Sequence, residues 1–81
     1  MHRNTLASLE QGQTATIEAV NAADPQVQRL MTLGLVEGAE VQFASAAIGG
    51  DPLEFRLFGR GISLRQEQAR HFMVAPVATS G

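Results

Sequence analysis

Cysteine is absent from this 81-residue chain, which excludes disulfides, thiolate metal ligands and a thiol nucleophile. No segment approaches the roughly 18 consecutive apolar residues of a membrane-spanning helix. The start, Met1-His2-Arg3-Asn4, lacks the apolar stretch of a signal peptide. We therefore expect a soluble, cytoplasmic protein.

Lysine, tyrosine and tryptophan are also absent, and the six arginines are outnumbered by eight acids, for a net charge of −2. Nucleic-acid-binding proteins usually show a basic stripe, often with aromatic side chains for stacking. Here the arginines are scattered, and only Arg56, Arg60 and Arg65 are placed to gather on one sheet. We expect no nucleic-acid partner.

The length of the chain allows one domain, residues 1–81, with a core at about 5–75 and a tail at 76–81. Apolar residues alternate with polar ones at 41–43 and 53–57, which predicts two half-buried strands. The Gly-Gly-Asp-Pro segment at 49–52 predicts a long-looped hairpin between them. Further strands are expected at 14–20, 62–64 and 72–74.

A helix is predicted to begin at Pro25, because Asp24 can cap it and proline is favoured at the first helical position. Gly34 is expected to end it after about three turns. A helical turn is predicted at 65–71. The fold class is therefore mostly β: a small SH3-like five-stranded barrel, closed on itself, with one short helix after the first strand and a helical turn before the last. An open α+β sheet is the alternative.

Residues for catalysis are sparse. A Ser-His pair would need Ser63 beside His71, without any supporting motif. Glu67 and His71 are four residues apart and would share a helical face, but two ligands do not make a metal site. The glycines at 49–50 and 59–61 lack the lysine of a phosphate-binding loop and fit hairpin turns. We expect no enzyme activity and no catalytic, cofactor-binding or metal-binding residues.

The apolar face of the predicted helix is the remaining candidate. Val27 and Met31 fit the core, but the helical period cannot place both Leu30 and Leu33 inward. An exposed apolar patch on a chain without evident chemistry points to a protein partner.

The order of several short motifs resembles the FeoA family of small ferrous iron transport proteins. The motifs are Arg29-Leu30-Met31-Thr32-Leu33-Gly34-Leu35-Val36-Glu37-Gly38, Gly50-Asp51-Pro52-Leu53, Gly61-Ile62-Ser63-Leu64-Arg65 and Glu67-x-Ala69. The resemblance extends from about Thr14 to Val74.

The resemblance implies an SH3-like barrel in the bacterial cytoplasm that assists FeoB, a ferrous iron permease, and is recruited to the inner face of the membrane through it. Leu30, Leu33 and Gly34 match the family's helix motif and are the expected partner-binding residues, while Asp51 and Pro52 are expected to be structural. The alternative is a metal-sensing regulatory domain like the C-terminal domain of iron-dependent repressors, using Glu67 and His71. An unpaired edge strand would also permit weak self-association.

Overall fold

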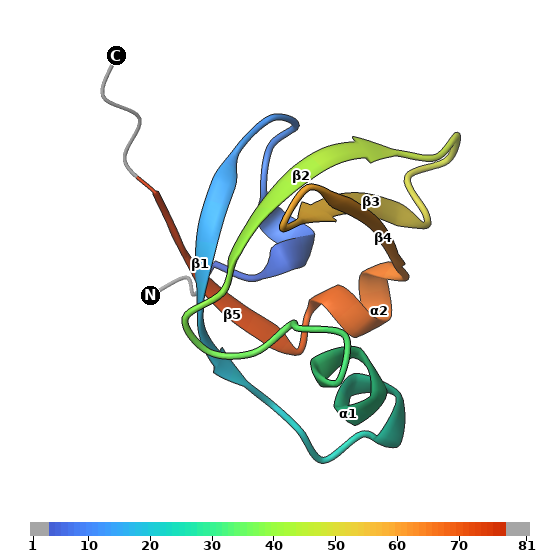
Figure 1. Ribbon diagram of the computed structural model, residues 1–81. Helices are drawn as coiled ribbons and strands as arrows, with labels where there is room; N and C mark the ends of the chain where they lie inside the picture. Colours follow the sequence, from blue (N-terminus) through green and yellow to red (C-terminus); the bar gives the residue numbers. More distant parts are fainter. Residues whose placement is uncertain (1–3, 78–81) are drawn as a thin grey trace.

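The computed structural model describes residues 4–77, which form one five-stranded antiparallel sheet that curls around a single core (Figure 1). Two short α-helices and a 3-10 turn accompany it. The elements are η1 (Leu6–Ser8), β1 (Thr14–Val20), α1 (Pro25–Met31), β2 (Glu40–Ala46), β3 (Leu53–Leu57), β4 (Arg60–Leu64), α2 (Gln66–Ala69) and β5 (Phe72–Pro76).

The strands are ordered β4-β3-β2-β1-β5. This mostly β, SH3-like architecture confirms the predicted fold class. The barrel is not closed, however, because β4 and β5 form no ladder with each other within residues 4–77. After Leu64 the chain turns into α2 before it enters β5, so a helical turn connects the two edge strands. The expected full closure is therefore wrong.

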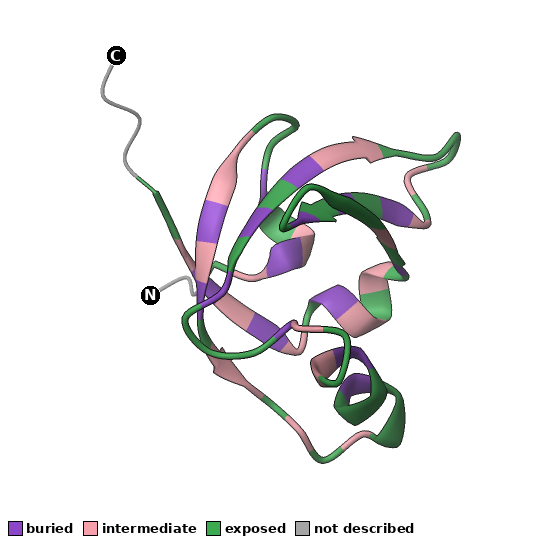
Figure 2. Ribbon diagram, viewed as in Figure 1, coloured by how far each residue is buried: buried purple, intermediate pink, exposed green. Residues whose placement is uncertain are grey.

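The predicted alternation on β2 and β3 is confirmed. Val41, Phe43, Leu53, Phe55 and Leu57 are buried, and the residues between them on β3 are exposed (Figure 2). The rings of Phe43 and Phe55 pack with their centroids 5.3 Å apart. Such pairs add to the free energy of apolar burial, which is the main force that holds a chain of this size together.

Two local features were not predicted from the sequence. A register shift between Ile17 and Ala19 interrupts the pairing of β1 with β5, so the expected alternation along β1 ends there. The 3-10 turn η1 is capped by the Thr5 hydroxyl, which accepts a hydrogen bond from the amide of Ala7. It buries Leu6 in the core.

Helix α1 begins as predicted. The Asp24 carboxylate accepts a 2.8 Å hydrogen bond from the amide of Gln26, and Pro25 is the first helical residue. The helix has seven residues, about two turns instead of the predicted three. After it, the amide of Gly34 bonds to the carbonyl of Met31, and that of Leu35 to the carbonyl of Leu30. This pair of bonds is a Schellman motif.

Asp51 connects the β2–β3 loop to α2. Its carboxylate accepts a 2.9 Å hydrogen bond from the amide of Gln66, the first residue of α2, and lies 3.9 Å from the Arg65 guanidinium. The Gln66 side chain in turn donates to the carbonyl of Gly50. The loop therefore caps the helix from outside, which is the structural role expected for Asp51.

We predict that Asp51→Ala lowers the free energy of unfolding by about 1 kcal/mol, because the first turn of α2 loses its capping acceptor. The exposed ion pair with Arg65 should contribute little. Urea denaturation measures the change. Asp51→Asn is the matched control: it keeps an oxygen acceptor and should retain most of the stability. A cost as large as that of alanine would assign the effect to charge instead of capping.

Candidate functional site: an exposed apolar patch

The end of α1 separates its two leucines. Leu30 is only 9% exposed and belongs to the core, whereas Leu33 is 52% exposed. The Schellman motif explains the difference, because it turns the chain at Gly34 and directs Leu35 into the core beside Leu30. Leu30 therefore presents little surface to a partner, although it lines a hollow beside Leu33 and Arg29. Its predicted role in partner binding stays a prediction.

Phe58 is the largest exposed residue that the sequence reasoning missed. It forms, with Gly59, the two-residue turn between β3 and β4, and its side chain is 78% exposed. Its φ angle is +53°, in the left-handed region. Such turns favour asparagine, aspartate or glycine, and a bulky residue there carries a conformational cost. The sequence predicts only a turn here, and the signal for a further role is a phenylalanine at a position that favours small or polar residues.

Gly34 brings these two segments together. A Cβ atom at Gly34 would lie 3.1 Å from Cδ2 of Leu57 and 3.6 Å from Cε2 of Phe58, so the turn after α1 packs directly against the hairpin end. Between them is a hollow of about 100 Å³ lined by Leu33, Leu57, Phe58, Arg60, Gly61 and Ile62. We call the surface formed by Leu33, Gly34 and Phe58 the Leu33–Phe58 patch.

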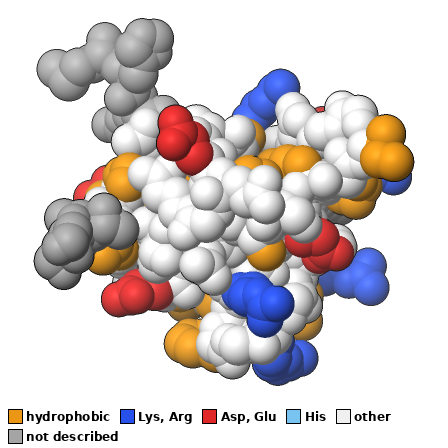
Figure 3. Space-filling model, turned by 90° about the horizontal axis from the view of Figure 1, so that it is seen from above, with side chains coloured by type: hydrophobic (Ala, Val, Ile, Leu, Met, Phe, Trp, Pro, Cys, Tyr) orange, Lys and Arg blue, Asp and Glu red, His pale blue; other side chains and the backbone are white. Residues whose placement is uncertain are grey.

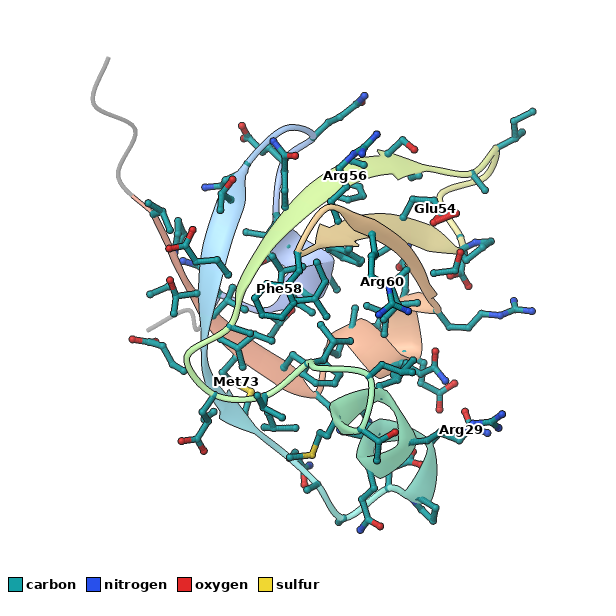
Figure 4. All side chains as sticks on the ribbon, in the orientation of Figure 1. Arg29, Glu54, Arg56, Phe58, Arg60 and Met73 are labelled. Carbon is teal, nitrogen blue, oxygen red and sulfur yellow. The ribbon has the colours of Figure 1, made fainter. Side chains whose placement is uncertain are left out.

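Three arginines and one glutamate lie beside this patch. Arg60 lines the same hollow as Leu33 and Phe58, Arg29 lines a neighbouring hollow with Leu33, and Arg56 lines another with Phe58 and Glu40. Figure 4 shows Phe58 and Arg60 at the end of the β3–β4 hairpin and Arg29 on α1. On the face shown in Figure 3, acidic and basic side chains are interspersed.

The residues considered for chemistry do not converge. His71 lies beyond Arg70, the residue that caps the end of α2, so Glu67 and His71 do not share a regular helical face. Within residues 4–77 no group of three His, Cys, Asp or Glu side chains could hold a metal ion. The Ser63 hydroxyl donates to the Glu54 carboxylate at 2.9 Å. Nor is any helix of this part long and apolar enough to cross a membrane.

Comparison with known proteins gives one family. A sequence model of the FeoA domain matches residues 4–76. No curated protein matches the chain.

Solved structures agree with that family. FeoA from Chlorobium tepidum is 37% identical, with a TM-score of 0.84 over 93% of this chain and 71% of that one. The zinc complex of FeoA from Stenotrophomonas maltophilia, described as a prokaryotic SH3 domain protein, is 32% identical, with a TM-score of 0.79 over 89% of each chain. A manganese-dependent transcriptional repressor shares the fold at 18% identity, with a TM-score of 0.82 over 95% of this chain and 38% of its own.

Proposed function

This chain belongs to the FeoA family, and we propose that it is a non-enzymatic accessory protein of bacterial ferrous iron uptake. It binds the cytoplasmic region of a FeoB-type permease and modulates transport. The Leu33–Phe58 patch makes the contact, and the protein is recruited to the inner face of the membrane through it. Leu33 and Gly34 keep the roles suggested by the sequence, and Phe58 is added to them. Leu30 acts mainly by supporting the fold, since it is 9% exposed.

The observation that carries this proposal is the exposure of Phe58 on a left-handed backbone. The residue contributes little to the core, yet it occupies a turn position where asparagine or glycine would cost less. Together with Leu33 it forms an apolar surface at which two separate segments meet. Exposed aromatic and aliphatic residues surrounded by arginines are typical of the centre of a protein interface.

We predict that Phe58→Asn raises the stability of the fold but lowers its affinity for the permease. Asparagine tolerates the left-handed conformation, so the free energy of unfolding should rise by about 0.5–1 kcal/mol. Affinity for the permease's purified cytoplasmic region should fall by about tenfold or more, because the aromatic anchor is lost. Leu33→Gln should weaken binding similarly without changing stability by more than about 0.5 kcal/mol. Isothermal titration calorimetry and urea denaturation measure the two effects.

Ile48 supplies the matched control. It is fully exposed at the β2–β3 loop, outside the patch, so Ile48→Gln removes an apolar surface of comparable size. Its affinity should equal that of the unmodified protein. Equal weakening by all three substitutions would mean nonspecific apolar contact, and full binding by both patch variants would refute the proposed surface.

A further inference from the structure

β4 is an edge strand with unused backbone groups. In a two-residue hairpin the flanking residues, here Leu57 and Arg60, form a hydrogen-bonded pair. The alternation of an antiparallel ladder then directs the N–H and C=O groups of Gly61 and Ser63 away from β3. Among the described residues, no backbone group outside the sheet bonds to either of these amides. Two donor–acceptor sets are therefore free at alternate positions, which is the spacing of a strand.

Two hollows lie beside this edge, and between them they are lined by residues of β4, of α1 and of the turn that follows α1. The hollow beside Phe58 includes Gly61 in its lining. A second hollow of about 350 Å³ includes Ser63 and Arg29, and Leu33 lines both. We call these two hollows together the β4 groove. Gly61 lines one hollow and Ser63 lines the other, and Leu33, which lines both, offers an apolar contact shared by the two.

The charge along the groove has one sign. Arg29 and Arg60 are exposed and, among residues 4–77, are the only charged side chains that line the two hollows. The carboxylate of Glu54 is bonded to the Ser63 hydroxyl, and Glu54 lines a different hollow, with Ala44 and Ser45 of β2. The β4 groove is therefore complementary to a ligand with negative charge on either side of an apolar group.

We propose that the β4 groove binds an extended peptide segment with acidic residues around an apolar side chain, added to the sheet as a sixth strand. Main-chain hydrogen bonds to Gly61 and Ser63 hold the segment, Leu33 and Phe58 contact its apolar side chain, and Arg29 and Arg60 select for its acids. The inference rests on the proposed function in one respect: the segment would belong to the permease's cytoplasmic region.

The direct test uses a synthetic peptide, Asp-Glu-Val-Ile-Val-Glu-Asp, titrated into the full-length ¹⁵N-labelled chain. Saturation should slow amide hydrogen exchange at Gly61 and Ser63 by about tenfold or more, because these amides become hydrogen-bonded. The same peptide with every acid replaced by lysine should bind about tenfold more weakly. The acidic peptide N-methylated at alternate residues, which cannot pair with the edge, should lose binding to a similar extent.

Substitutions in the protein test the same two contributions to binding, the charge of the arginines and the main-chain hydrogen bonds of β4. Arg60→Glu should weaken the acidic peptide about tenfold, whereas Arg70→Glu, an equal charge change on an exposed residue that lines neither hollow, should have little effect. Ser63→Pro removes one outward N–H and should weaken binding, whereas Ser63→Ala keeps that N–H and should not. The ¹⁵N spectrum shows whether each variant is folded. The N-methylated peptide tests the main-chain hydrogen bonds without altering the protein.

Specific outcomes would overturn the proposal. Equal affinity for the N-methylated and unmodified peptides would exclude strand addition. The amides of Gly61 and Ser63 could already exchange slowly without peptide while sedimentation shows a dimer. That result would mean that a second copy of the chain occupies the edge. If the permease's cytoplasmic region binds and the acidic peptide does not compete, the proposed function stands and strand addition fails. If the peptide binds and the permease does not, strand addition stands without that partner.

Discussion

Replacement of Leu30 by glutamine is expected to lower the free energy of unfolding by about 2–4 kcal/mol, because it exchanges a buried apolar side chain for an amide with few hydrogen-bond partners. Leu30 lies in the core and supplies the carbonyl that accepts the Leu35 amide in the Schellman motif. For a domain of this size the loss is a large fraction of the total stability. Urea denaturation followed by circular dichroism measures it.

Leu33→Gln is the matched control for Leu30→Gln, since it makes the same chemical change three residues later on an exposed side chain. The two variants should show opposite profiles. Leu30→Gln should lose stability and bind the permease in proportion to its folded fraction, whereas Leu33→Gln should stay stable and lose affinity. A stable Leu30→Gln that fails to bind would mean that Leu30 itself contacts the partner.

The second large effect is expected for Gly34→Ala, which should cost about 2–4 kcal/mol. Part arises because φ is +113°, a conformation that alanine rarely adopts. The remainder arises because the new Cβ would lie 3.1 Å from the Leu57 side chain and force the turn and the hairpin apart. Because Phe58 follows Leu57, the affinity for the permease should fall as well. Denaturation and calorimetry measure the two losses separately.

Gly38→Ala isolates the packing contribution at Gly34. Its φ of +90° carries a similar backbone cost, but a Cβ there would meet nothing within 4 Å. Gly38→Ala should therefore be the milder variant by about 1–2 kcal/mol and should retain affinity. Equal losses at the two positions would show that the turn does not press on the hairpin.

The sequence predicted the strands well because most of them have one buried face, and burial enforces a period of two. The start of α1 was equally readable, since Asp24 and Pro25 act locally. Whether the barrel closes could not be predicted from the sequence, because closure depends on how the chain crosses from β4 to β5. The turn η1 was missed because three residues carry too little periodicity to be recognised.

Only part of the candidate site could be predicted from the sequence, because the remaining part depends on contacts between distant segments. Leu33 and Gly34 could be found because they form a helix end with a sequence signature. Phe58 lies 25 positions beyond Leu33 in the numbering, and only the folded sheet brings the two into one hollow. The separation of Leu30 from Leu33 likewise needed the Schellman geometry, which the helical period alone does not specify.

Few hydrogen bonds connect α1 to α2 or to the sheet. In the described part of the chain, the side-chain hydrogen bond from Gln68 to Gln26, 2.8 Å long, is the only one that connects α1 to α2 or the sheet. Short helices held mainly by one buried face open locally before a sheet does. A partner that contacts Leu33 on one side and Phe58 on the other would connect the end of α1 to the β3–β4 hairpin. Binding would then be expected to slow amide hydrogen exchange in α1 as well as at the contacting residues.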